Sequence, residues 1–158
     1  MQHWPDCFCQ SKRWKIYDQV VLHIVFCQIK AMYNPFTRAE ENAIMLYVFS
    51  IIDADVHIDK SEEAFLTLLG LKFGFSQSDL EKAVCIGDWT ASSTLSSMSS
   101  EKKRLAAYLF TAAAMADGNT KLGKAEFTKC LEILKKCSLP LDIKFTDAPR
   151  IAHDFVGA

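Results

Sequence analysis

The sequence has few residues that break helices and no long apolar run. Only six glycines and four prolines occur in 158 residues, a composition that favours helix and excludes collagen-like and Pro/Gly-rich disordered chains. The longest apolar stretches, residues 20–29 and 43–52, reach about half the length of a membrane span. The first ten residues are polar and do not form a signal-peptide pattern. These absences predict a cytoplasmic protein without a membrane span.

Neither sign of charge dominates the chain. Eighteen Lys and Arg residues stand against nineteen Asp and Glu residues, which excludes the strong basic footprint of a nucleic-acid-binding domain. The charge is instead segregated. Residues 33–63 hold seven acidic and two basic residues, whereas residues 101–136 hold eight basic and four acidic ones. We therefore expect a protein partner, which the sequence does not identify, and no nucleic acid.

Motifs of common enzyme classes are also missing. The chain contains no Gly-rich phosphate loop, no Gly-x-Ser-x-Gly and no His-Glu-x-x-His. Four of its six cysteines, Cys27, Cys85, Cys130 and Cys137, are interpreted as small core residues, since they fall inside or next to helical patterns. We expect a non-enzymatic protein without catalytic residues. The alternative is a small cysteine-dependent redox protein or another enzyme that uses Cys7, Cys9 or His57.

Helix signals account for most of the chain. Thr37 and Glu40 form a capping box that predicts a helix to about residue 53, and Asp59 and Glu62 form a second box for a helix ending near residue 74. Ser76 begins a short helix that Gly87 is expected to stop. Further helices are predicted over residues 16–31, 100–116, 124–136 and 147–155. Residues 91–100 are predicted to be a Ser/Thr-rich loop with at most one turn of helix.

No segment has a convincing strand pattern, so the predicted class is all-α with about seven to eight helices. The apolar side of the predicted helix over residues 16–31 carries Val20, Val21, Ile24, Val25 and Ile29. The helix faces predict the following core residues: Ile24, Ile44, Tyr47, Val48, Ile51, Phe65, Leu68, Leu69, Leu105, Tyr108, Leu109, Leu131 and Leu134.

Two stretches of the chain resemble each other. Ala54-Asp55 is followed by Glu62 and Phe65, and Ala116-Asp117 is followed by Glu126 and Phe127. The aspartates are 62 residues apart and the glutamates 64, so the loops differ in length. Each copy reads as helix, acidic loop, helix. A helical hairpin does not bury its apolar stripe alone, so we expect the two copies to face one another across an approximate two-fold axis.

This doubled pattern, with Ala116-Asp117-Gly118 as its clearest copy, resembles that of TerB-like domains, which include tellurite-resistance TerB proteins and the N-terminal domain of the co-chaperone DjlA. The resemblance implies a single TerB-like domain over residues 1–158, with a first repeat at 37–80, a second at 100–143 and an additional helical segment at 1–33. It also implies a role in tellurite resistance or another stress response. One departure is Val56, which stands where the family usually has glycine.

The acidic loops are the candidate functional site. The resemblance implies divalent-metal binding by Asp55, Glu62, Asp117 and Glu126, and the loop also contains Asp59. Grouped carboxylates suit a hard cation such as calcium, which takes several oxygen ligands. The alternative is structural, because Asp59 and Glu62 are also placed to cap a helix.

Overall fold

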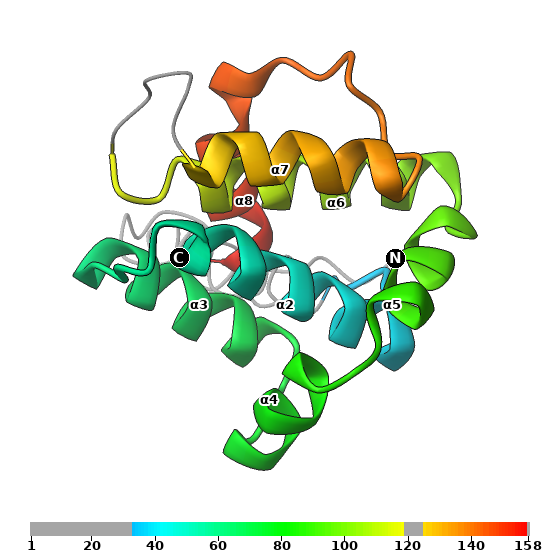
Figure 1. Cartoon of the computed structure of the whole chain (residues 1–158), viewed down its shortest axis with the longest axis horizontal. Coiled ribbons are helices and arrows are strands. Elements are labelled where there is room, and N and C mark those ends of the chain that lie inside the picture. Colours follow the sequence, from blue (N-terminus) through cyan, green and yellow to red (C-terminus); the bar gives the residue numbers. More distant parts are fainter. Residues whose placement is uncertain (1–32, 119–124, 158) are drawn as a thin grey trace, which may run out of the picture.

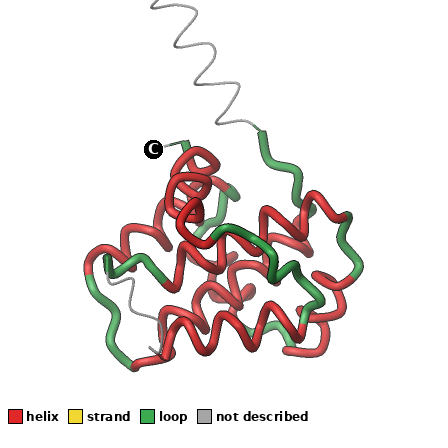
Figure 2. The backbone as a smooth tube through the Cα atoms, turned by 90° about the horizontal axis from the view of Figure 1, so that it is seen from above, coloured by secondary structure: helices red, strands yellow, loops and turns green. Residues whose placement is uncertain are grey.

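The computed structural model describes residues 33–118 and 125–157, and within these ranges the protein is all-α with seven α-helices and no strand (Figures 1 and 2). The predicted fold class is confirmed. The predicted helix over residues 16–31, with Ile24, lies outside the described residues. The helices are α2 (Arg38–Ile52), α3 (Lys60–Lys72), α4 (Gln77–Val84), α5 (Asp88–Ser96), α6 (Ser100–Ala114), α7 (Ala125–Lys136) and α8 (Ala148–Val156), with short 3₁₀ turns η1 (Asp53–Asp55) and η2 (Phe145–Asp147).

The helices form two hairpins that lie one over the other. Figure 1 shows α6 and α7 side by side above α2 and α3, with α8 behind them and α4 and α5 linking the two hairpins. Helix α2 contacts both α6 and α7, so it forms the centre of the bundle. Within the described ranges, no helix combines the length and hydropathy needed to cross a bilayer.

The helix starts follow local capping chemistry. Both predicted capping boxes are present: Thr37 accepts a hydrogen bond from the Glu40 amide, and Asp59 accepts from the Glu62 amide, with each glutamate bonding back to the cap. Ser76 and Asp79 form a third box at α4. The role predicted for Gly87 was wrong, because α4 already ends at Val84 and Gly87 is the N-cap of α5.

The predicted loop over residues 91–100 was also wrong, since most of it lies in α5 and the start of α6. Ala91 and Leu95, one turn apart on α5, are fully buried. The Tyr47 hydroxyl, on α2, lies 3.1 Å from the backbone oxygen of Asp88 and 3.0 Å from its carboxylate. Tertiary packing therefore stabilises a helix whose Ser/Thr content gives it little intrinsic propensity.

One continuous apolar core joins the two hairpins, and it includes Ile44, Tyr47, Val48, Ile51, Leu69, Leu109 and Leu134 as predicted. Four other predicted core residues, Phe65, Leu105, Tyr108 and Leu131, are only partly buried and pack against its edge. Leu68 was wrongly predicted, because 37% of it is exposed. Helix α3 carries apolar residues on several sides, so its sequence pattern does not define a single buried face.

Candidate functional site

The first acidic loop links α2 to α3. Its Asp55 carboxylate accepts a hydrogen bond from the His57 amide at 2.9 Å, and the Asp59 carboxylate accepts from the amides of Ser61 and Glu62 at 2.8 and 2.9 Å. The Glu62 carboxylate in turn accepts from the Asp59 amide at 2.8 Å. The capping role considered for Asp59 and Glu62 is therefore confirmed.

The second acidic loop shares two features with the first. Val56 and Gly118, which each follow an Ala-Asp pair, both have left-handed backbones, with φ of 66° and 73°. Glu62 and Glu126, each in the first turn of the following helix, are both buried, at 2% and 4% exposure. The two copies therefore share a backbone conformation and a buried carboxylate, in addition to their sequence pattern.

The first acidic loop packs against the second hairpin. Burial raises the pKa of Glu62 above its usual value of 4.5, and the negative charges of Asp59, Asp55 and Asp117 raise it further, against the lowering effect of the Asp59 amide. Asp117 belongs to the second hairpin, so its charge reaches across from one copy to the other. The short turn η1 also packs against α7, the helix that carries Glu126. Residues from both loops therefore lie at the same end of the bundle.

The five predicted ligands are of a chemical type that calcium binds, because all of them offer carboxylate oxygens. Their placement is not that of a formed metal site: among the residues the structure describes, no group of three or more His, Cys, Asp or Glu side chains is arranged to hold a metal ion. Asp55 is exposed, whereas Asp59 and Asp117 are half-buried. A cation would therefore need side-chain movement to gather its ligands.

The left-handed residue in each loop leads to a paired prediction. A β-branched side chain destabilises this conformation by roughly 1–2 kcal/mol, and glycine adopts it freely at some cost in chain entropy. Val56 is 87% exposed, so Val56→Gly loses little packing and should raise the free energy of unfolding by up to about 1 kcal/mol. Gly118→Val should lower it by about 1–2 kcal/mol, although a Cβ there would meet nothing within 4 Å. Urea titrations of both variants check this, and effects of the same sign would contradict it.

The raised pKa of Glu62 predicts a pH-dependent stability difference. A carboxyl group with a higher pKa in the folded state binds its proton more tightly there, so ionised Glu62 destabilises the fold above that pKa and the cost disappears as pH falls. Glutamine keeps an oxygen for the Asp59 amide. Glu62→Gln should therefore be more stable than the wild type at pH 7, with the gain vanishing near pH 4, in urea titrations at several pH values.

Asp79 provides a control of opposite sign. Hydrogen bonds from the amide and hydroxyl of Ser76 hold the pKa of Asp79 below its usual value of 3.8. A lowered folded-state pKa contributes stability above the unfolded value and loses it as pH falls. Asp79→Asn should therefore destabilise the protein at pH 7 and lose its effect in acid. If the free energies of unfolding of Glu62→Gln and Asp79→Asn changed with pH in the same way, the causes assigned to the two pKa shifts would be wrong.

The structure describes one of the three residues named for the enzyme alternative. Cys7 and Cys9 lie outside the described residues, and His57 is exposed. Burial raises the pKa of Cys130 to about 12 and that of Cys137 to about 11, which disfavours the reactive thiolate. Cys85 is exposed. The two buried thiols therefore behave as core residues.

Many charges on the basic segment over residues 101–136 are paired. Lys102 contacts Glu40 at 2.8 Å, Arg104 contacts Asp142 at 3.4 Å, and Lys136 contacts Asp88. Lys136 and Asp88 line a polar pocket of about 280 Å³ with Tyr47, between α2, α5 and α7. The sequence did not predict this pocket, since Tyr47 and Asp88 are 41 residues apart and share no motif.

Comparisons with known proteins give the fold alone. No model of a known protein family matches the sequence, and no curated protein does. A crystal structure of a protein of unknown function from Porphyromonas gingivalis is similar, with a TM-score of 0.60 and 22% sequence identity. The alignment covers 76% of this chain and 98% of that one. The chain therefore shares its helical architecture with a protein whose own function is not established.

Proposed function

We propose that this chain is a non-enzymatic, cytoplasmic TerB-like domain whose paired acidic loops bind a divalent cation such as calcium. The observation that carries the proposal is that η1, which contains Asp55, packs against α7, which carries the buried Glu126. The link to a stress response, such as tellurite resistance, rests on the resemblance of the two Ala-Asp loops to the family pattern.

The electrostatics of the loops explain why a cation would bind. Asp55, Asp59 and Asp117 all raise the pKa of Glu62, so the ionised carboxylates repel one another in the folded protein. A divalent cation relieves this repulsion and takes oxygen ligands. Because the ligands are not gathered in advance, binding must include movement of the more exposed aspartates, and we expect modest affinity.

Calcium should therefore stabilise the folded protein. A ligand at a hundred times its dissociation constant adds about 2.7 kcal/mol if it binds only the folded state. The test is thermal unfolding with and without millimolar calcium, for the wild type and for Asp55→Asn with Asp117→Asn. Asparagine keeps an acceptor for the His57 amide, so the double variant should fold and lose the calcium response.

A matched control removes two carboxylates elsewhere. Asp142 and Asp154 pair with Arg104 and Arg150 on other parts of the surface. Asp142→Asn with Asp154→Asn also removes two negative charges and should keep the full calcium response. An absent response in the wild type, or an equal response in both double variants, would limit the loop residues to capping.

A further inference from the structure

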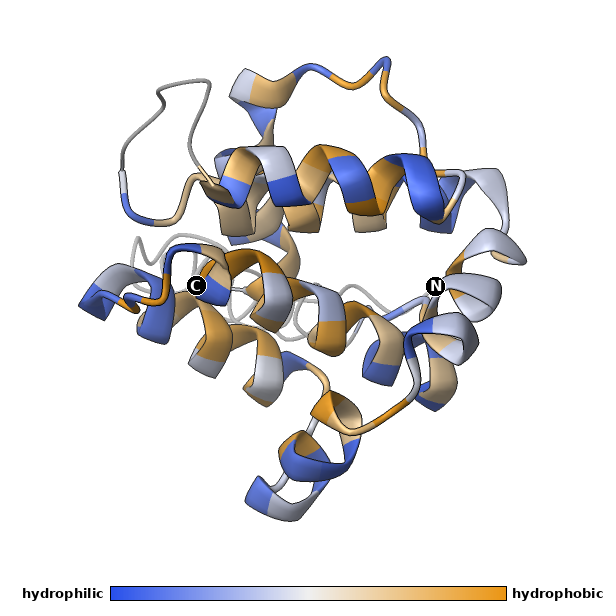
Figure 3. Cartoon of the chain, in the orientation of Figure 1, coloured by the Kyte–Doolittle hydropathy of each residue, from blue (hydrophilic) through white to orange (hydrophobic). Residues whose placement is uncertain are grey.

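Helix α3 carries more apolar surface than the described part of the protein covers. Only Glu62, Leu69 and Gly70 of its thirteen residues are buried, whereas Leu68 is 37% and Leu71 is 69% exposed. Figure 3 shows the apolar stretches along this helix. Leu68 and Leu71 lie one turn apart, so they form an exposed apolar patch on one side of α3.

A groove runs along one side of this surface. It lies between α3, α6 and α8, has a volume of about 390 Å³, and is lined mainly by apolar side chains, among them Phe65, Leu68, Met115 and Val156. Ser61 and Ala116 also line it. These two residues are close in sequence to Asp59 and Asp117, so one end of the groove adjoins the acidic loops.

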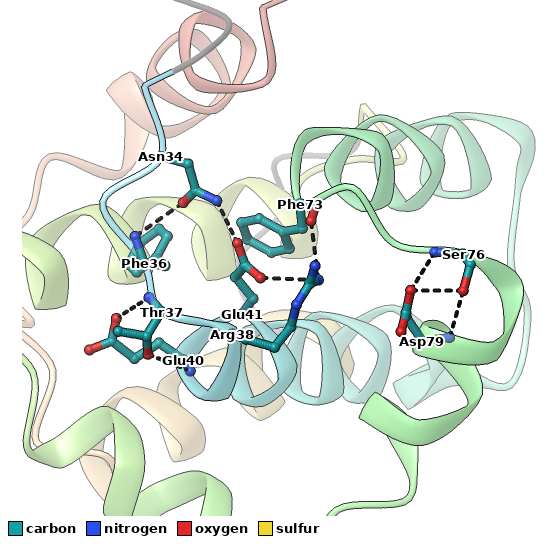
Figure 4. Close-up of polar contacts among 9 residues, drawn as sticks. All are labelled: Asn34, Phe36, Thr37, Arg38, Glu40, Glu41, Phe73, Ser76 and Asp79. Atoms are coloured by element: carbon teal, nitrogen blue, oxygen red, sulfur yellow. Dashed lines mark hydrogen bonds and ion pairs between the residues drawn. The ribbon is translucent and has the colours of Figure 1, made fainter.

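The chain enters the described fold beside α3 and α8. The Phe36 ring packs edge-on against Phe73, the C-cap of α3, and against Phe155 near the end of α8, with centroid distances of 6.2 and 6.0 Å. Figure 4 shows how polar contacts fix this entry, with Asn34 bonded to Glu41 and to the Phe36 amide. The residues that precede Tyr33 therefore start next to the two helices that flank the groove.

The segment before Tyr33 is long enough to lie along α3 and has an apolar side. The helix predicted over residues 16–31 would be about 24 Å long, against about 20 Å for α3. Its apolar side, with Val20, Ile24 and Ile29 among its residues, has no partner within the segment itself. Residue 32 alone separates its end from Tyr33, so the predicted helix must begin its path close to the entry point.

The point where the chain enters the fold sets the direction of the predicted helix along α3, and charge complementarity agrees with that direction. A helix that ends near Tyr33 and lies along α3 places its N-terminal end at the N-terminal end of α3, where the acidic loops are. Lys12, Arg13 and Lys15 come directly before the predicted helix in the sequence. We propose that residues 16–31 of this chain form a helix that fills the groove between α3, α6 and α8, with this basic end facing the acidic loops.

Hydrogen exchange of the full chain, followed by mass spectrometry, tests the docking. Amides of residues 16–31 should exchange at least tenfold more slowly than in an unstructured peptide. Leu68→Asp should abolish this protection, and Ile24→Asp should do the same from the other side of the contact. In both variants α6 should remain protected, which shows that the domain is still folded.

Val84→Asp is the matched control. Val84 is also 37% exposed, but it lines a different apolar groove between α2, α3 and α4. This variant should leave residues 16–31 protected. The proposal is overturned if these residues are unprotected in the wild type, if Val84→Asp and Leu68→Asp have equal effects, or if the protection falls on dilution, which would make a second copy the donor of the helix.

The orientation has its own test. Lys15→Glu, at the acidic end, should reduce the protection of residues 16–31 more than Lys30→Glu, at the opposite end of the same segment. Equal effects, or no effect of Lys15→Glu, would overturn the proposed direction. Both readouts are made without calcium, so they do not depend on whether the acidic loops bind a cation.

Discussion

Replacing Leu109 with alanine should lower the free energy of unfolding by about 2–5 kcal/mol. Leu109 is fully buried on α6, the helix that contacts α2, α7 and α8. The substitution removes apolar surface that is withdrawn from water and leaves a cavity that tightly packed neighbours close only in part. Urea titration, monitored by far-ultraviolet circular dichroism, measures the change.

Leu141→Ala is the control for this prediction. Leu141 is 46% exposed in the segment between α7 and α8, so the same chemical change creates no enclosed cavity. Its effect should stay below about 1 kcal/mol. If the two leucines gave equal losses, Leu109 would not hold the centre of the core.

The helix starts could be predicted because their causes are local. Thr37 and Glu40, and Asp59 and Glu62, satisfy each other's backbone groups within four residues, so the sequence pattern contains the whole interaction. Helix α5 could not be found in this way. Its apolar residues are sparse, and its contact with Tyr47 spans 41 residues, so its stability depends on the assembled bundle.

The core side of a helix could be predicted only where its pattern has one apolar stripe. Ile44, Val48 and Ile51 on α2 are fully buried, as their spacing indicates. On α3, apolar residues cover more than half of the helix circumference, and periodicity does not determine which of them face the core; these residues are Phe65, Leu66, Leu68, Leu69 and Leu71. The error at Leu68 thus comes from the same excess of apolar residues that makes α3 a docking surface.

The repeated Ala-Asp pairs predicted where the two acidic loops lie in the chain, and the first of them packs against α7 of the second hairpin. The burial of the two glutamates was not predicted. That Glu62 and Glu126 would be among the most buried charged side chains did not follow from their exposed-looking positions in the first turn of a helix. Burial depends on how α3 and α7 pack, which spacing along the chain does not contain.

Phe155→Ala should cost about 3–5 kcal/mol, the other large effect that we expect from a single substitution. The Phe155 ring packs edge-on against Phe36 and Phe73, with centroid distances of 6.0 and 6.2 Å, and Lys72 lies over its face. This cluster joins the chain entry, the end of α3 and α8. Alanine removes the buried ring together with its favourable aromatic contacts.

Phe155→Leu distinguishes the contribution of side-chain volume to stability from that of the aromatic contacts. Leucine refills most of the space and should cost less than about 1.5 kcal/mol. Urea titration of the two variants measures the difference, and hydrogen exchange should show that the alanine variant loses protection in α8 before α6. Because Phe36 and Phe155 come from opposite ends of the described chain, their contact closes the fold. Equal stabilities for the alanine and leucine variants would mean that the contacts of α8 with α6 hold this end without the ring.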